Sequence, residues 1–228
     1  MTGSFFGMPM DSSPSKAAQL QLNRSIVYID GFNLYYGALK GSPHKWLNLE
    51  RYFRLLLSGH DIQKIRYFTA RVVGPEAGDQ ETYLSALATL PLIDIIFGQF
   101  KTKQIQGLCP SCPLPSPQFF STYEEKHTDV NIAIWMFHDA QKNLCDRLIL
   151  VTGDSDLVPA IAMIKDQFPE KTISVYIPAR NKIRGAAVEL RSIADRHKTL
   201  PLNILPAAQF PAEIKTGAGV LIKKPISW

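Results

Sequence analysis

Short apolar runs alternate with segments of helical periodicity from Ser25 onward, and this alternation constrains the fold more than any other feature. Buried strands are predicted at Ser25–Asp30, Ile62–Val73, Ile93–Phe100, Asp146–Thr152, Lys171–Ile177 and Leu200–Leu205. Helices are predicted at Leu47–Leu57, Glu76–Thr89, Asp129–Lys142, Ser155–Gln167 and Gly185–Ala194. Such an order predicts an α/β fold, doubly wound, with a mainly parallel sheet and helices on both faces.

The 228 residues suit one large domain with tails. Residues 1–23, rich in Ser, Pro, Met and Gln, predict a flexible N-terminal tail, and the domain is expected over 24–205. Prolines and cysteines interrupt it at 106–121, which predicts an inserted loop. Residues 206–228 show no clear period and predict an irregular C-terminal tail.

Composition narrows the functional class only a little. The formal net charge of +5 favours polyanionic partners such as nucleic acid, although many unrelated proteins have this balance. Three cysteines argue against a disulfide framework. The N-terminus lacks the features of a signal peptide, and no stretch approaches the roughly 18 apolar residues of a membrane span. We therefore expect a cytoplasmic protein with no membrane partner.

Four aspartates are expected at one edge of the predicted sheet. Asp30 directly follows the strand SIVYI, and Asp154 and Asp156 follow LILVTG. Asp129 opens the helix that begins VNIAIWM. Ligands of such sheets bind outside the carboxyl ends of the strands. Each aspartate alone has an ordinary explanation as a helix cap or a turn residue, but all four would have to share this edge by chance.

Carboxylates that share a site repel one another, so their convergence suggests a bound cation. Oxygen ligands without histidine or cysteine favour Mg²⁺ or Mn²⁺ over Zn²⁺. A cation of this kind commonly works on phosphate, where it activates water and stabilises the leaving oxygen. The four aspartates are therefore predicted to be both metal ligands and catalytic residues.

The chain resembles the NYN domain family, a branch of the PIN-like nucleases, in three motifs. These are YIDGFNLYYG at 28–37, EEKHTDVNIAI at 124–134 and VTGDSDLVPAI at 151–161. The resemblance covers roughly residues 25–205 and implies Mg²⁺- or Mn²⁺-dependent cleavage of RNA. By position, it places Asp30, Asp129, Asp154 and Asp156 in the acidic site.

The same resemblance assigns two further residues. Asn33 matches the polar residue after the first aspartate and is expected to bind substrate, and Lys126 matches a lysine that could contact phosphate. Leu157 departs from the family pattern, which often has an aromatic residue after GDSD; we expect no chemical effect.

Basic and aromatic residues near the predicted site suggest how RNA would be held. We expect the RNA to be bound in single-stranded or unpaired regions. Arg180, Lys182 and Arg184 follow the strand KTISVYI and are candidate phosphate contacts, with a solvated loop as the alternative. Tyr35, Tyr36 and Trp46 could stack on bases, but core packing is expected for at least one of them.

Cys109 and Cys112 have the spacing of half a zinc site. The second half is missing, so an ordinary loop is the favoured interpretation, with a zinc site shared across a dimer left open.

Two other functions compete with RNA cleavage. A phosphatase of the haloacid dehalogenase type needs an acid two residues after its first aspartate, where this chain has Phe32. A non-catalytic module that binds RNA or protein through the same fold remains as the alternative, because fold does not fix function. The sequence leaves a homodimer open.

Overall fold

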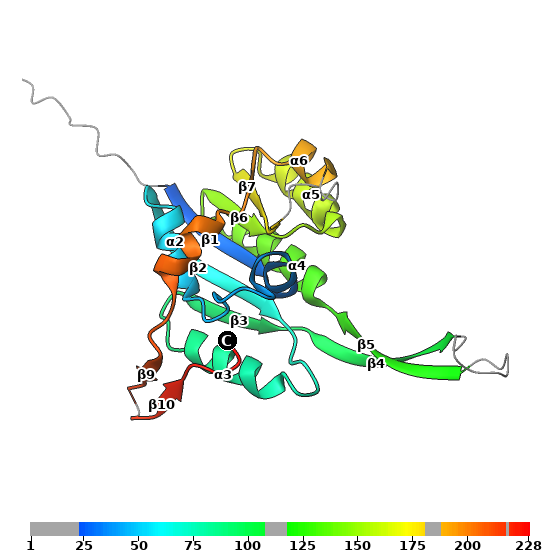
Figure 1. Cartoon of the computed structure of the whole chain (residues 1–228). Coiled ribbons are helices and arrows are strands. Elements are labelled where there is room, and N and C mark those ends of the chain that lie inside the picture. The colour runs from blue at the N-terminus through cyan, green and yellow to red at the C-terminus, as the bar shows by residue number, and fades with distance from the viewer. Residues whose placement is uncertain (1–22, 108–117, 181–187, 218) are drawn as a thin grey trace, which may run out of the picture.

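The computed structural model describes residues 23–107, 118–180, 188–217 and 219–228 (Figure 1). The predicted N-terminal tail, apart from Asn23, and the Cys109–Cys112 segment therefore lie outside the described residues, as do Lys182 and Arg184. The strands are β1 (Asn23–Asp30), β2 (His60–Thr69), β3 (Ile93–Phe97), β4 (Gln99–Gly107), β5 (Gln118–Lys126), β6 (Arg147–Val151), β7 (Thr172–Ile177), β8 (Arg196–Thr199), β9 (Glu213–Lys215) and β10 (Leu221–Lys223).

The α-helices are α1 (Gly31–Leu34), α2 (Leu49–Leu56), α3 (Ala77–Leu87), α4 (Thr128–Gln141), α5 (Val158–Gln167) and α6 (Val188–Ile193). Three further turns are η1 (Tyr35–Leu39), η2 (Ser155–Leu157) and η3 (Leu202–Ala208). No helix within the described ranges is long and apolar enough to cross a membrane.

Six strands form one sheet in the order β3-β2-β1-β6-β7-β8, and every neighbouring pair in it is parallel. The predicted doubly wound α/β fold is confirmed. From β1 the chain adds β2 and then β3 toward one edge of the sheet. It then returns to the centre, where β6 pairs with β1, and adds β7 and β8 toward the other edge. A crevice opens at such a reversal because the connections on its two sides diverge.

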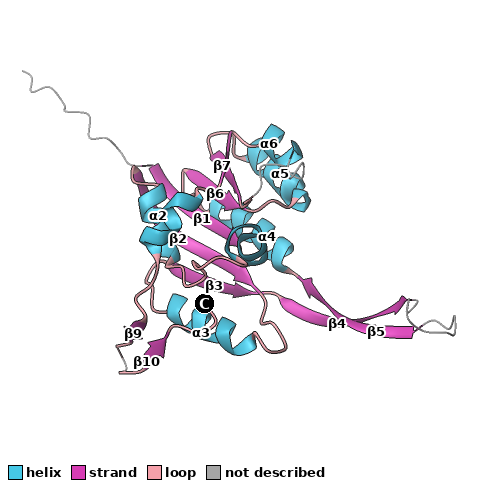
Figure 2. Cartoon of the chain, viewed as in Figure 1, coloured by secondary structure: helices cyan, strands magenta, loops and turns pink. Residues whose placement is uncertain are grey.

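The two faces of the sheet bury separate apolar cores, since side chains alternate along each strand. On one face, Val27 and Ile29 of β1 pack with residues of α2, α3 and η3. On the other face, Ile26 and Tyr28 pack with residues of α4, α5 and α6. Figure 2 shows the sheet between these two groups of helices.

The predicted inserted loop at 106–121 is wrong at both of its ends. Residues 106–107 belong to β4 and 118–121 to β5, and the two strands pair antiparallel from Gln99↔Lys126 to Gly107↔Gln118. This hairpin projects from the body of the molecule as an arm (Figure 1). Proline and cysteine residues in this segment indicated a loop. The two strands also lack a clear alternation of apolar and polar residues, because their residues are exposed on both faces, so the sequence did not predict them.

Gly98 joins the sheet to this arm, and its lack of a side chain is required there. A Cβ at this position would lie 2.6 Å from the carbonyl oxygen of Lys126 and 2.8 Å from the Oγ1 of Thr128. The start of β4 therefore lies directly against the start of α4.

The expected irregular C-terminal tail instead packs onto the domain. Phe210 and Ile222 join the core beside α2 and α3, and β9 pairs with β10. Trp228 packs edge-on against Trp46, with 6.3 Å between ring centroids and 77° between the ring planes. Trp46 is itself 1% exposed, so base stacking by this residue, one of the sequence interpretations, is wrong.

Two other expectations change. The strand predicted at Leu200–Leu205 is displaced, because β8 ends at Thr199 and the 3-10 turn η3 begins at Leu202. The helix predicted at Asp129–Lys142 is apolar on most sides by its sequence, which favours burial, but α4 keeps an exposed apolar edge where Val130 and Ile134 are each 59% exposed.

A buried ion pair connects the sheet to α4. The Arg66 guanidinium on β2 donates to both carboxylate oxygens of Asp139 at 2.8 Å, and the Tyr28 hydroxyl donates to the same carboxylate at 2.8 Å. Asp139 is fully buried, and Trp135 lies 4.0 Å from the guanidinium carbon. Because the charges are paired in a bidentate geometry, the carboxylate tolerates its burial.

We expect Asp139→Asn to lower the free energy of unfolding by about 3–5 kcal/mol, because it removes the buried, bidentate partner of Arg66 and leaves only the half-exposed Asp94 to pair with it. Asp94→Asn is the matched control: Asp94 also pairs with Arg66, but its side chain is 38% exposed. That variant should lose about 1 kcal/mol or less. Urea unfolding of the three proteins measures both values, and equal losses in the two variants would contradict the assignment.

Candidate metal centre

Asp30 occupies the carboxyl end of β1, at the point where the strand order reverses. Its Oδ1 accepts from the Asn33 backbone N–H at 2.9 Å, which begins α1. Its Oδ2 accepts from the Asn33 side-chain amide at 2.6 Å and from the Thr152 hydroxyl at 3.1 Å. These three donors hold the carboxylate in a fixed orientation between β1 and β6.

Asn33 also joins the two strands. Its Oδ1 accepts from the Gly153 backbone N–H at 3.1 Å, while its amide nitrogen donates to Asp30. Asn33 was predicted to bind substrate, but in this structure both ends of its amide hold the ends of β1 and β6 together.

Asp154 and Asp156 lie in the turn after β6. The Thr152 hydroxyl accepts from the Asp154 backbone N–H at 3.1 Å, and Asp154 Oδ1 accepts from the Asp156 backbone N–H at 3.0 Å. Asp154 is thus the N-cap of η2 through its Oδ1, and its Oδ2 takes no part in capping the turn. Asp156, which could have been an ordinary helix cap by its sequence, does not cap this turn.

Asp129 reaches the same region from α4. The chain enters this helix through His127, whose φ of 79° makes a sharp turn between β5 and α4. Glu125 steadies that turn, because its Oε1 accepts from the Thr128 backbone N–H at 3.1 Å and from the Thr128 hydroxyl. Asp129 itself forms no hydrogen bond with another residue in the ranges that the structure describes.

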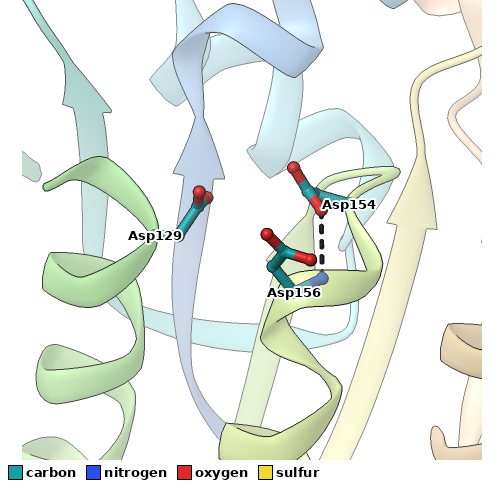
Figure 3. A group of neighbouring side chains, drawn as sticks. All are labelled: Asp129, Asp154 and Asp156. Atoms are coloured by element: carbon teal, nitrogen blue, oxygen red, sulfur yellow. Dashed lines mark hydrogen bonds between the residues drawn. The ribbon is translucent and has the colours of Figure 1, made fainter. Parts of the chain in front are cut away.

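Oxygen atoms of Asp129, Asp154 and Asp156 all lie within 4.8 Å of one another (Figure 3). Two oxygens bound to one Mg²⁺ are at most about 4.2 Å apart, given bonds of about 2.1 Å. Small rotations would therefore bring the three to a common ion, and their chemistry fits Mg²⁺ or Mn²⁺. Asp30, expected in the same group, lies beside it with its oxygens held by Asn33 and Thr152.

Burial and mutual repulsion raise two pKa values here. Burial is the main cause that raises the pKa of Asp129 to about 6, and Asp30, Asp154, Glu125 and Asp156 add to it in that order. Burial also raises the pKa of Asp30, although its hydrogen bonds from Asn33 and Thr152 oppose the shift. Repulsion of this kind is what a cation between the carboxylates would relieve.

The structure describes two of the basic residues predicted to bind phosphate. Arg180, exposed after β7, donates through Nε to the Ala38 carbonyl at 3.0 Å. Lys126, exposed at the end of β5, donates to Glu124 at 2.7 Å. Each therefore has a protein partner in this structure, and a role in phosphate contact stays a prediction.

An aromatic cavity of about 180 Å³ opens beside the acidic group. Gly31, the residue after Asp30, forms part of its wall. Its ring-bearing lining residues are Phe32, Tyr35, Tyr36, Tyr67, Tyr83 and Trp228. The Tyr35 hydroxyl forms no hydrogen bond within the described part of the chain. A cavity of this size and lining accommodates one planar ring.

Sequence reasoning missed Thr152 and Glu125. Both stand in the motifs that carry the acidic residues, VTGDSD and EEKHTD. Thr152 was read only as part of a strand, yet its hydroxyl links Asp30 to the Asp154 backbone. A hydroxyl that both donates and accepts in this way depends on the side-chain rotamer, which the sequence pattern does not reveal.

Comparisons with known proteins bear on this site. The NYN domain family model matches residues 24–201. The 6-hydroxy-3-succinoylpyridine 3-monooxygenase HspA of Pseudomonas putida (strain DSM 28022 / S16) is 30% identical over 237 residues, covering 90% of this chain and 75% of that protein. A solved structure of a Vibrio parahaemolyticus protein of unknown function is 15% identical, with a TM-score of 0.51 over 79% of this chain and 94% of its own. At that identity, the structural likeness concerns the fold alone.

The raised pKa of Asp129 predicts a pH-dependent effect in metal-free protein. In the unfolded chain an aspartate has a pKa of about 3.9. The folded state therefore holds an extra proton between about pH 4 and 6, and folding stability falls as the pH rises through this window. In chelator, Asp129→Asn should melt at a higher temperature than wild type at pH 7.5, and the difference should vanish near pH 4.

Asp61→Asn removes a charge from an exposed position in β2 and is the control for this series. Its melting temperature should follow that of wild type at both pH values. A stabilisation by Asp129→Asn that stays the same from pH 4 to 7.5 would contradict the assigned pKa.

Proposed function

Because this chain belongs to the NYN domain family, whose members are PIN-like nucleases, we propose that it is a metal-dependent ribonuclease. The observation that carries the proposal is the group of Asp129, Asp154 and Asp156, whose oxygens lie within 4.8 Å of one another. The reaction proposed is hydrolysis of RNA phosphodiester bonds, with Mg²⁺ or Mn²⁺ as cofactor. Asp30 is assigned to the same site.

Each aspartate has a proposed task that follows from its contacts. Asp129, Asp154 and Asp156 would hold the cation, since their oxygens converge and those of Asp30 are engaged. When bound, that cation would polarise the phosphoryl oxygen and lower the pKa of the attacking water. Asp30 would orient the others through Thr152, whose hydroxyl donates to Asp30 and accepts from the Asp154 N–H.

Asp129 would act as a charged ligand rather than as a proton acceptor. Burial and the neighbouring carboxylates raise its pKa to about 6 in the metal-free site, and a bound cation would lower it again. Because Asp129 lacks a hydrogen bond to any described residue, its oxygens are available to that cation. In hydrolysis, the water oxygen bonds to phosphorus, the water proton passes to solvent, and the P–O bond to the leaving oxygen breaks.

Unpaired RNA is the substrate class we propose. The aromatic cavity beside Asp30 could hold one flipped base against Tyr35 or Tyr36, as aromatic side chains do for single strands. Arg180 and Lys126 would supply phosphate contacts once released from their partners, and Lys182 and Arg184 are proposed for the same role. A non-catalytic RNA- or protein-binding module on this fold is the alternative.

A second candidate function is oxygenation of a small heteroaromatic ring, favoured by two observations. A relative at 30% identity is a 6-hydroxy-3-succinoylpyridine 3-monooxygenase, and the aromatic cavity of about 180 Å³ is close in size to one such ring. A monooxygenase transfers one oxygen atom of O₂ to its organic substrate. Two electrons and two protons reduce the other atom to water, so an external two-electron donor is required.

RNA cleavage provides the main test. Wild-type protein with Mn²⁺ or Mg²⁺ should cleave single-stranded RNA, and chelator should stop it. Asp154→Asn should lower the rate by at least about a hundredfold. Asparagine keeps an oxygen that accepts from the Asp156 N–H, so the turn should survive. Asp166→Asn, which removes one exposed charge from α5, should cleave like wild type.

Thermal melts separate metal binding from a folding defect. Metal that binds only folded protein raises its melting temperature. Millimolar Mn²⁺ should therefore raise that of wild type and of Asp166→Asn, and do much less for Asp154→Asn. Cleavage by Asp154→Asn at the wild-type rate, or equal metal shifts in all three proteins, would rule out the shared site.

The second function predicts a different readout. With 6-hydroxy-3-succinoylpyridine and a reduced nicotinamide as electron donor, O₂ uptake should depend on the ring compound, and Tyr36→Ala should weaken that dependence. Arg51→Ala, an exposed substitution on α2, is the control. Substrate-independent O₂ uptake in a preparation that cleaves RNA would reject this candidate.

A further inference from the structure

A hollow of about 290 Å³ lies at the opposite end of the strands from the acidic group. Its basic lining residues are His60, Arg147, Arg196, His197 and Lys198, and no carboxylate of the described residues lines it. Arg147 begins β6, whereas Asp154 follows the end of that strand. Four residue steps of about 3.3 Å separate the two ends of β6, so Arg147 and Asp154 lie more than about 13 Å apart along that strand.

The bases of this hollow lack counterions within the described residues. None of its arginines or its lysine forms an ion pair with a described carboxylate. The Nη1 of Arg147 lies 3.1 Å from the Nε2 of His60, and the buried Nε of Arg147 has no partner among the described residues. Because that Nε is enclosed by the protein, a ligand in the hollow would contact the outer nitrogens of the Arg147 guanidinium instead.

The protonation of His60 follows from its two contacts. An arginine only donates, so Nε2 accepts from Arg147 and Nδ1 carries the proton that faces the Ser25 hydroxyl at 2.7 Å. Burial lowers the pKa of His60, and the nearby charges of Arg147 and Arg196 lower it further. His60 is therefore the neutral group that fixes Arg147 in place.

Repulsion also acts on the arginines themselves. Burial lowers the pKa of Arg147, and Arg196 adds to this effect, with Tyr176 opposing it. The C-terminal end of α2, at Leu56 and Leu57 on the rim, opposes this repulsion in part. A helix end carries about half a negative charge, which cannot balance the guanidinium groups of two arginines and the ammonium group of a lysine.

Edge protection explains only part of this arrangement. β8 is the last strand of the sheet, and charged residues on such an edge prevent pairing with other chains. That accounts for Arg196, His197 and Lys198. It does not account for Arg147 and His60, which begin interior strands of the same sheet.

We propose that this hollow binds the phosphate group of a phosphorylated ligand. The N–H donors of Arg147 and Arg196 together match the several oxygens of a phosphate group, in a monoester or a diester, better than the two oxygens of a carboxylate. Ser174 adds a hydroxyl to the same hollow. The ring of Tyr176 and the side chain of Leu56 provide a less polar wall for the organic part of the ligand.

Two sources of that phosphate are compatible with the chemistry: a free nucleotide and the backbone of an RNA strand. The site does not depend on the proposed hydrolysis, because it contains none of the aspartates. The test therefore uses wild-type protein in chelator, with inorganic phosphate, adenosine monophosphate and a ten-nucleotide RNA as separate probes, each measured by calorimetry.

Arg196→Gln and Arg147→Gln should each weaken binding of at least one probe about tenfold or more, as expected when a charged donor is removed. Arg191→Gln removes an exposed arginine from α6 and serves as the matched control. Loss of affinity for phosphate and the mononucleotide identifies a free ligand, whereas loss for RNA alone identifies the backbone. Both outcomes support the site.

Equal affinities of all four proteins for all three probes would overturn the proposal. Stability in phosphate-free buffer gives a second readout, which needs no ligand. Arg196 is exposed, and its charge is repelled by that of Arg147. The melting temperature of Arg196→Gln should therefore be no lower than that of wild type. A clearly lower melting temperature for that variant would show that the arginine stabilises the fold instead, and would also overturn the proposal.

Discussion

The parallel pairing of β1 with β6 is the constraint on which the acidic site depends. These strands are remote in sequence, and their hydrogen bonds run from Ser25↔Arg147 to Ile29↔Val151. The register places the residues that follow them, Asp30 and Thr152, side by side, and Asn33 then ties the two ends together. A slip of one residue would turn every side chain of β6 to the other face and separate these groups.

The same pairing separates two electrostatic environments. Carboxylates gather where the strands end, and guanidinium and imidazole groups gather where they begin. Each cluster raises the free energy of its own folded chain, and each is left without an internal counterion in the described residues. By contrast, the fully buried Asp139 is bonded to Arg66 and Tyr28. Charged residues are therefore paired where they are buried between the sheet and α4, and they are left unpaired at the ends of the strands, where ligands can approach.

Much of the sheet could be predicted from the sequence, because the strands β1, β6 and β7 are short apolar runs, each with a helix after it. The order of aspartates along the chain also predicted which segments meet. The arm was not predictable in the same way, since its residues are exposed on both faces. Burial of Trp46 against Trp228 depends on a contact between distant segments, which local periodicity cannot reveal.

The arm has one more consequence, which concerns how such a chain can diversify. A hairpin gains or loses length by opposite pairs of residues, and each such change leaves its base where it was. At that base, Gly98 lies against Lys126 and Thr128, and Asp129 follows at once. The length and sequence of the outer arm can therefore change during evolution to suit different partners, while the carboxylates keep their positions.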